Sequence, residues 1–330
     1  MGHNSRLELI KKIEEKRNSS LISYIAGDRE NVSTRIAADS IRVIFRHLER
    51  IGTSKRIDLF LYTRGGDVLT PWRLINLIRE YTDEFSVIVP FRSYSAGTLI
   101  CLGANEIVMG KMGELGPIDP VVANAFNPTD PEKPTARVPI SVEDVSSYLN
   151  LAAQKGKLKE EGSLLNVFIK LVERVHPLSL GNVHRNYQLI RSTARKLLKL
   201  SNTNSKESEI NAVVDYLTKK LYAHNYMIPR KEAKNEIGLN VIYPENELEN
   251  VIWDLYKEYE KKLKLREPFS PHSVDITSGH NNLDFKVCGG IIESKEALDY
   301  FVYNGKVTKK YEGNNKFEVE IISQKWKSEI

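Results

Sequence analysis

Ser95 lies in a stretch whose residue types suit nucleophilic catalysis, Ser93-Tyr94-Ser95-Ala96-Gly97-Thr98. An apolar run ends at Pro90 before it, and a helix-like apolar pattern follows it. The first N–H groups of a helix have no partner within the helix, so a serine at such a junction has backbone donors beside it. A hydroxyl next to such donors can attack a carbonyl carbon while the donors stabilise the oxyanion. The alternative interpretation is a serine that only caps the helix.

A second junction, Gly65-Gly66, occurs about thirty residues earlier, after the apolar run Ile57-Asp58-Leu59-Phe60-Leu61-Tyr62-Thr63. A helix pattern with apolar residues at helical spacing follows the two glycines. Glycines at this point allow a ligand to approach the backbone closely. In parallel sheets, ligands bind beyond the carboxyl ends of the strands, so we expect both junctions at one edge and in one site.

Alternating strand and helix patterns position these junctions. We expect strands at 20–25, 57–63, 85–90 and 106–109, with helices between them. Strands that alternate with helices form a mostly parallel sheet with right-handed crossovers. The predicted fold class is therefore α/β, with helices that flank the sheet.

Three segments carry a resemblance to a known family: IDLFLYTRGGD, SYSAGTLICLGANEIVM and LGPIDP. They resemble the serine dehydrogenase proteinase family, relatives of Clp protease and signal peptide peptidase A that share the Clp/crotonase fold. The match is dense from Ile57 to Pro120 and thinner up to Tyr243. By motif, the resemblance implies a triad of Ser95, Asp119 and His224.

The chemistry requires the same residue types. A serine hydroxyl becomes a good nucleophile when a base, most often histidine, takes its proton, and a buried carboxylate can fix the imidazole tautomer. The expected oxyanion hole consists of the N–H groups of Gly66 and Ala96, with help from Gly65. We expect Gly66→Val to abolish turnover, because the added side chain would block the site, while the protein remains folded.

Each residue of the triad has a rival interpretation. Asp119 lies between two prolines and could shape a turn, and His224 could close a loop. His176 and His184 are alternative bases. A Ser-Lys pair, as in signal peptide peptidases, is a further alternative. It would use one of three lysines: Lys155, Lys157 or Lys159.

The chain departs from the family's pattern at three positions. Arg64 stands where the family has proline, Ala96 where it has glycine, and Val121 where it has glutamine. None of these changes removes a catalytic side chain. Because Arg64 places a fixed positive charge near the cleft, we expect substrates that carry a carboxylate.

Composition narrows the function classes. The chain has 330 residues, 41% of them hydrophobic, and a net charge of +5 with no basic patch interleaved with aromatic residues, so we expect no nucleic-acid partner. Two cysteines fit a reducing, cytoplasmic location. The seven histidines lack metal-ligand spacing, and we expect neither metal nor cofactor. We expect no signal peptide and no membrane-spanning segment, which leaves peripheral membrane association open.

We predict two domains: a Clp/crotonase-like serine peptidase domain over residues 1–245, and a helix with a small β-rich α+β extension over residues 246–330. Asn304-Gly305 predicts a hairpin turn in the extension. The predicted function is peptide-bond hydrolysis through an acyl-enzyme, acting on peptides or proteins. The resemblance implies a homo-oligomer. Two other functions are a catalytically silent scaffold or partner-binding protein of the same fold and, less favoured, a crotonase-type hydratase or isomerase.

Overall fold

The structure is a computed structural model that describes residues 3–118, 121–122, 124–130, 132–133, 135–158, 160–221, 223, 225–270, 282–310 and 316–329. An eight-stranded sheet forms its centre. The strand order is β12 (Val241–Ile242), β7 (Glu106–Met109), β5 (Glu84–Val89), β4 (Arg56–Tyr62), β1 (Ser20–Ala26), β13 (Asn282–Glu293), β14 (Leu298–Lys310) and β15 (Lys316–Ser328). The strands from β12 to β1 pair in parallel, and those from β1 to β15 pair antiparallel. The α/β fold with a mostly parallel central sheet is confirmed.

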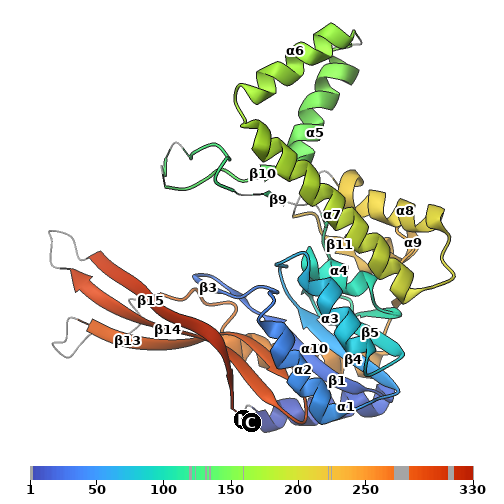
Figure 1. Ribbon diagram of the computed structural model, residues 1–330. Coiled ribbons are helices and arrows are strands. Elements are labelled where there is room, and N and C mark those ends of the chain that lie inside the picture. Colours follow the sequence, from blue (N-terminus) through green and yellow to red (C-terminus); the bar gives the residue numbers. More distant parts are fainter. Residues whose placement is uncertain are drawn as a thin grey trace.

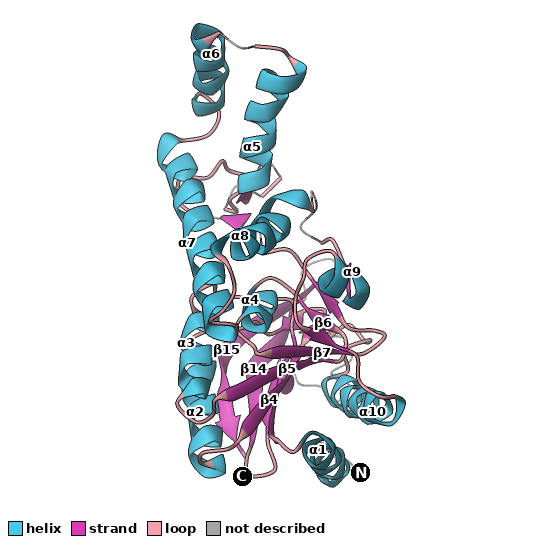
Figure 2. Ribbon diagram, turned by 90° about the vertical axis from the view of Figure 1, so that its right-hand side faces the viewer, coloured by secondary structure: helices cyan, strands magenta, loops and turns pink. Residues whose placement is uncertain are grey.

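Helices cover both faces of the parallel strands (Figure 2). One face carries α2 (Ser40–Ile51), α3 (Thr70–Arg79), α4 (Ala96–Leu102) and α7 (Pro177–Ser201), and the other carries α1 (His3–Arg17) and α10 (Asn246–Leu263). The strands are buried on both faces, so each reads as a continuous apolar run rather than as an alternating one. In β1 and β4, every residue after the first is buried. This is why the runs at 20–25 and 57–63 correctly predicted strands.

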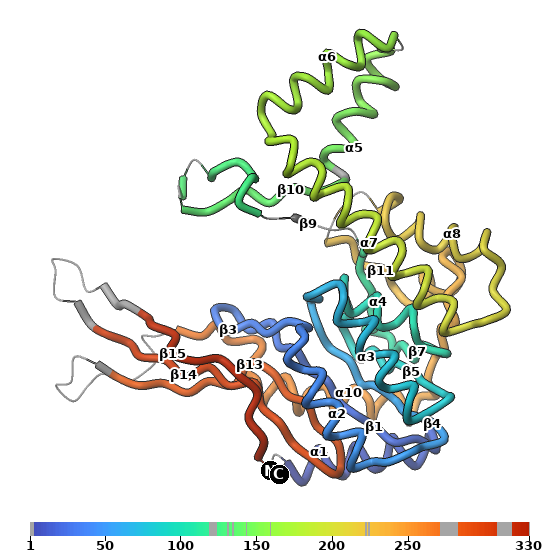
Figure 3. Tube along the Cα trace, in the orientation of Figure 1, coloured from blue at the N-terminus to red at the C-terminus, as the bar shows by residue number. Residues whose placement is uncertain are grey.

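Smaller elements complete the chain (Figure 1). A helical arm projects from the body: α5 (Val142–Asn150), the π-helix η1 (Leu151–Lys155) and α6 (Glu161–Val172), joined at its base by the pair β9 (Val121–Val122) and β10 (Ile140–Ser141). The body also contains α8 (Glu207–Asp215), the π-helix η2 (Tyr216–Lys220) and α9 (Arg230–Asn235). A second sheet of β11 (Ile228–Pro229), β8 (Glu114–Leu115) and β6 (Arg92–Ser93) lies beyond the parallel strands, and β2 (Asp28–Arg29) pairs with β3 (Val32–Ser33). Figure 3 follows the same path as a trace.

The C-terminal strands extend the main sheet. Residues Ser23 to Ala26 of β1 pair with Gly290 to Glu293 of β13, and α10 packs beside α1. In the described part of the chain, residues after 245 therefore share a sheet and a core with those before it. None of the described helices is both long enough and apolar enough to cross a lipid bilayer.

The hairpin turn predicted at Asn304-Gly305 is wrong. Both residues lie inside β14 and pair with Lys286 and Phe285 of β13. The register with β15 shifts at this point, which marks a β-bulge. A Cβ at Gly305 would lie 2.4 Å from the Phe285 ring, so the glycine allows this ring to pack closely across the sheet.

Candidate active site

Ser95 has a backbone conformation that is rare for a residue with a side chain. Its φ is 51° and its ψ is −109°, and holding a non-glycine residue in such a region costs about 1 to 3 kcal/mol. The residue is the N-cap of α4, yet its side chain makes no capping hydrogen bond. Ser95 is half-buried. The turn therefore presents the hydroxyl to the surface without using it to start the helix.

The two junctions identified in the sequence lie against each other. The N–H of Thr63 donates to the carbonyl of Arg92 at 2.9 Å, and the N–H of Tyr94 donates to the carbonyl of Thr63 at 3.1 Å. These bonds align the end of β4 with the segment that leads to Ser95. A Cβ at Gly65 would lie only 2.8 Å from the Cβ of Ser95. Glycine is required here because a side chain would occupy the place of the serine.

One N–H of the glycine turn remains available for a ligand. The N–H of Gly65 donates to Thr63 Oγ1 at 2.9 Å. The carbonyl of Gly65 accepts from Ile36 at 2.9 Å, and the carbonyl of Ile36 accepts from Asp67 at 2.8 Å. The N–H of Gly66, which lies between these bonds, donates to no atom of the described residues. Of the two glycines, only Gly66 therefore offers a free donor.

A second available N–H belongs to Ala96. Around it, the N–H of Gly97 donates to the carbonyl of Tyr94 at 2.8 Å, and the N–H of Leu99 donates to the carbonyl of Ser95 at 3.0 Å. Within the described ranges, the N–H of Ala96 has no acceptor. Ala96 directly follows Ser95 in the chain, so its N–H belongs to the same turn.

Thr98 links the serine turn to the segment that carries Asp119. Its Oγ1 lies 2.9 Å from the carbonyl oxygen of Ser93 and 2.8 Å from that of Gly116, and it accepts the N–H of Gly116 at 3.2 Å. Two residues later, the N–H of Ile118 donates to the carbonyl of Leu217 at 3.1 Å. Leu217 belongs to the π-helix η2, and π-helical segments are frequent at functional sites. Residues 116–118 thus join the serine turn to the helix that precedes His224.

Three of the sequence-predicted residues, Asp119, His224 and Lys159, lie outside the described residues. The hydrogen bonds of Thr98 and Ile118 locate residues 116–118, which precede Asp119 in the chain, and Leu217, which precedes His224. Among the described residues, no imidazole, ammonium or carboxylate forms a hydrogen bond with Ser95 Oγ. The partner of the serine therefore stays a prediction.

The alternative histidines both lie on or next to α7. His176 caps this helix: its Nδ1 accepts the N–H of Leu178 at 3.2 Å, and its ring stacks on Phe126 with centroids 4.9 Å apart. His184 is exposed on α7. No hydrogen bond within the described part connects either imidazole to the serine turn. The observed role of His176 is to begin the helix.

The alternative lysines belong to the projecting arm. Lys155 ends the π-helix η1, and Lys157 follows it with a positive φ of 54°. Both residues are exposed. An ammonium must be buried or lie beside other cations to lose its proton near neutral pH, and these two are in solvent.

A buried Ser-His-Asp set that the sequence did not predict lies elsewhere. His47 Nδ1 is 2.8 Å from Ser294 Oγ, and its Nε2 is 3.1 Å from Asp299 Oδ2. None of the three residues is more than 1% exposed, so no substrate can reach the serine. The set instead ties α2 to the turn between β13 and β14. His47 and Ser294 are 247 positions apart, and no local sequence pattern predicts their contact.

Because Asp299 is charged, the contacts that connect α2 with the β13–β14 turn depend on pH. Burial alone would raise the pKa of Asp299, but hydrogen bonds from His47 and Arg46 outweigh it and hold the pKa below its usual value. A depressed carboxyl pKa stabilises the fold above about pH 4, the unfolded value, and this stabilisation is lost as the pH falls through the folded pKa. We expect Asp299→Asn to lower the free energy of unfolding by about 1 to 3 kcal/mol at pH 7 and to flatten its decline below pH 4.

Urea unfolding between pH 7 and pH 3 measures both effects. The matched control is Asp254→Asn, which removes an exposed ion pair with Lys257 on α10 and should change stability by less than about 0.5 kcal/mol. If Asp299→Asn and Asp254→Asn lost equal stability, Asp299 would not have the stabilising role proposed for it.

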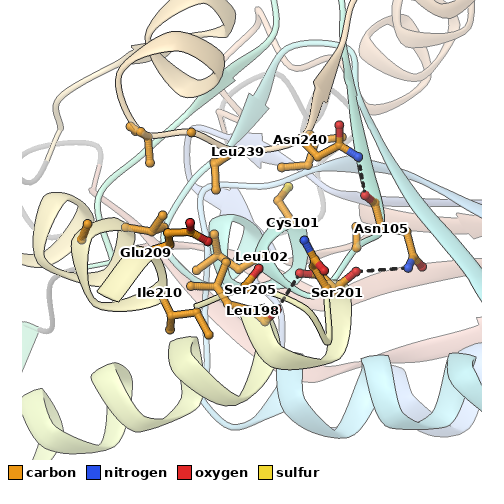
Figure 4. Close-up of a pocket in the computed structure, with 17 residues that line it drawn as sticks. Cys101, Leu102, Asn105, Leu198, Ser201, Ser205, Glu209, Ile210, Leu239 and Asn240 are labelled. Carbon is orange, nitrogen blue, oxygen red and sulfur yellow. Dashed lines mark hydrogen bonds between the residues drawn. The ribbon is translucent and has the colours of Figure 1, made fainter. Parts of the chain in front are cut away.

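A large cavity lies behind α4, at the end opposite Ser95. Its volume is about 650 Å³, and its walls come from α4, α7, α8 and the segment before β12 (Figure 4). Asn240 Nδ2 donates to the carbonyl of Asn105 at 2.7 Å, and Asn105 Nδ2 donates to the carbonyl of Ser201 at 3.2 Å. Cys101 lines the cavity, and burial raises the pKa of its thiol to about 12. The cavity is separate from the serine turn and contains no activated nucleophile.

Comparison with known families finds a match for the part of the chain that contains the serine turn. Residues 2–131 match the ClpP-like SDH-type serine proteinase family. Over these residues, which are less than half of the chain, the sequence is similar to ClpP-like serine proteinases. The match contains Ser95, Gly65, Gly66 and Ala96 and confirms the resemblance seen in the sequence.

Relatives extend beyond this segment. The chain is 27% identical over 281 residues to uncharacterized protein MJ0137 of Methanocaldococcus jannaschii, which covers 83% of this chain and 86% of that protein. It is 30% identical over 125 residues to uncharacterized protein MJ1495 of the same organism, which covers 36% of this chain and 42% of that protein.

Two solved structures show limited similarity. An alanine mutant of the 1510-N membrane-bound stomatin-specific protease matches with 13% identity and a TM-score of 0.37, over 68% of this chain and 79% of that one. A second mutant of the same protease, in complex with a substrate peptide, matches with the same identity and TM-score, over 64% and 73%.

Proposed function

We propose that this peptidase hydrolyses peptide bonds through an acyl-enzyme on Ser95, with His224 as the base and Asp119 as the carboxylate that orients it. The N–H groups of Gly66 and Ala96 hold the oxyanion. Gly65 does not supply an N–H to the oxyanion, because its N–H donates to Thr63 Oγ1. Its role is to let the glycine turn pack closely against Ser95, since it has no side chain. The substrates are peptides or proteins.

The reaction proceeds in two halves. Ser95 Oγ attacks the carbonyl carbon while His224 takes the hydroxyl proton, and the carbonyl oxygen becomes an oxyanion. The C–N bond then breaks as the imidazolium protonates the leaving amine. Water, deprotonated by the same imidazole, cleaves the ester, and the proton returns to Ser95. Each oxyanion donor contributes about 2.7 to 4 kcal/mol to this kind of step.

The observation that carries the proposal is the conformation of Ser95 beside two free donors. A strained φ of 51° has a cost, and a turn that only capped a helix would not require it. Here the hydroxyl is uncapped, and among the described residues the N–H groups of Ala96, which follows Ser95, and of Gly66, which follows the Gly65 packed against Ser95, have no acceptor. Strain of this kind is concentrated at active sites.

Cell location and assembly are part of the proposal. We place the enzyme in the cytoplasm, and its free thiols, Cys101 and Cys288, support a reducing compartment. We also propose a homo-oligomer. The arm supports it, because α6 has no buried residue although it carries Leu165, Phe168 and Ile169 with 40% or more of their surface exposed.

A fluorophosphonate probe tests the proposal directly. The folded chain should form a covalent adduct, and peptide mapping by mass spectrometry should locate it on Ser95. The Ser95→Ala variant and the heat-denatured chain are the controls, and neither should react. A folded chain that resists the probe and cleaves no peptide would favour the catalytically silent scaffold.

The pH dependence of kcat/KM for the unmodified enzyme separates the two candidate bases. With a histidine base, kcat/KM falls as the pH drops through neutrality, because the imidazole must be neutral to accept a proton. With a lysine base among Lys155, Lys157 and Lys159, kcat/KM continues to rise into alkaline pH. His224→Ala should abolish the activity if His224 is the base, and should leave it in place if a lysine is the base.

A further inference from the structure

Arg64 holds an exposed guanidinium at the edge of the proposed active site. It directly precedes Gly65, whose Cα hydrogen faces the side chain of Ser95. Its side chain is 63% exposed, and Nε lies 3.2 Å from Asp28 Oδ2. Neither Nη group forms a hydrogen bond with a residue in the described part. The outer edge of the guanidinium is therefore free to bind a ligand.

Asp28, the anchor of this arginine, is itself held in place. Tyr62 donates its hydroxyl to Asp28 Oδ1 at 2.7 Å, and Arg92 Nη1 lies 3.4 Å from Oδ2. The side chain of Asp28 is 11% exposed. A carboxylate with two further partners fixes the position of Arg64 more firmly than a lone surface ion pair would.

The contacts continue to the residue before the nucleophile. Arg92 Nε donates to Glu114 Oε1 at 3.0 Å, and the Tyr94 hydroxyl donates to the same oxygen at 2.7 Å. Arg64, Asp28, Arg92, Glu114 and Tyr94 thus form a chain of contacts that starts at the glycine turn and ends beside Ser95. We call these five residues the arginine cluster.

Of the two cations in the arginine cluster, Arg64 is the one that a ligand can reach. Two carboxylates face two guanidiniums, but Arg92 contacts both carboxylates and lies over the Phe91 ring at 4.3 Å from its centroid. Burial and the hydrogen bond to Glu114 raise the pKa of Tyr94 to about 12, so its phenol stays neutral. A bound anion would therefore meet Arg64 first.

In the described residues, the remaining carboxylate of the glycine turn forms no ion pair with Arg64. Asp67 Oδ2 accepts the N–H of Thr70 at 3.0 Å and its hydroxyl at 2.6 Å, which caps α3. Asp67 Oδ2 is therefore engaged at the start of α3.

We propose that Arg64 forms a subsite for the carboxylate of an aspartate or glutamate side chain close to the scissile bond, with Asp28 as the residue that positions it. The guanidinium offers two Nη groups in the planar arrangement that matches a carboxylate. This subsite rests on the proposed peptidase function and specifies its substrate class as acidic peptides.

The experiment compares peptide pairs that differ only by glutamate or glutamine at one position near the cleavage site, using kcat/KM. The full chain should prefer the glutamate peptide by about two- to fivefold, the size of a partly exposed ion pair. Arg64→Gln should abolish this preference, and Arg64→Lys should retain part of it. Raising the salt concentration should reduce it in the unmodified chain and not in Arg64→Gln, because ions screen exposed charges.

Arg42→Gln is the matched control, since it removes an equal charge from the exposed face of α2 and should keep the full preference. An active chain with no preference, or an Arg64→Gln variant with an unchanged preference, overturns the subsite and leaves the peptidase proposal standing. A chain that neither cleaves the peptides nor reacts with fluorophosphonate overturns both.

Discussion

Replacing Ser95 with alanine is expected to reduce peptide hydrolysis by about 10⁶-fold, the size of effect seen when other serine peptidases lose their nucleophile. Alanine must adopt the same φ of 51°, so the variant keeps the strain of the turn and should unfold at the same temperature as the unmodified chain. Single-turnover kinetics and thermal melts measure the two properties on the same sample.

Ser95→Gly is the informative companion variant. Glycine adopts a positive φ without the penalty that serine incurs, so we expect equal loss of activity with a gain of about 1 kcal/mol in stability. A chain of this size should then melt about 2 °C higher. If Ser95→Gly melted no higher than Ser95→Ala, the turn would not be strained as described.

Substituting Gly66 is expected to have the second largest effect, and on folding as well as on catalysis. A Cβ at this position would lie 2.0 Å from the carbonyl oxygen of Ile36 and 2.7 Å from its nitrogen. Main-chain atoms cannot yield as a flexible side chain can, so the bridge between Ile36 and Gly66 must open. We expect Gly66→Ala to lose about 2 to 4 kcal/mol of unfolding free energy and all detectable fluorophosphonate labelling.

Gly181→Ala is the control, because nothing lies within 4 Å of its added Cβ and the residue is inside α7. That change should raise stability by up to about 1 kcal/mol. A Gly66→Ala chain with unchanged stability and labelling would show that Ile36 can move aside. The sequence alone suggested a folded but inactive Gly66→Val variant, and the position of Ile36 changes that expectation.

The sequence predicted the parts of the fold that carry local signals. The runs in β1, β4, β5 and β7 are buried on both faces, so their composition alone marks them as strands. The serine and glycine junctions followed from the rule that parallel strands end at one edge of a sheet. Their direct packing, 2.8 Å from a Gly65 Cβ to Ser95, agrees with that rule.

What the sequence did not predict depends on contacts between distant residues. The motif Asn304-Gly305 has the local signal of a turn, but pairing with β13 and β15 keeps it extended. The pairing of β1 with β13 has no local signature either, nor does the contact of His47 with Ser294. The free N–H groups of Gly66 and Ala96 became evident only from the hydrogen bonds of their neighbours.

The pairing of β1 with β13 also sets the order in which the nascent chain can fold. β1 ends at Ala26, and its second partner begins at Asn282. At about 5 to 20 residues per second, the ribosome releases β13 roughly 10 to 60 seconds after β1. Until then one side of β1 has unpaired backbone groups, the kind of edge that recruits other chains. The interval in which newly made chains are most exposed to aggregation therefore ends when the C-terminal strands emerge.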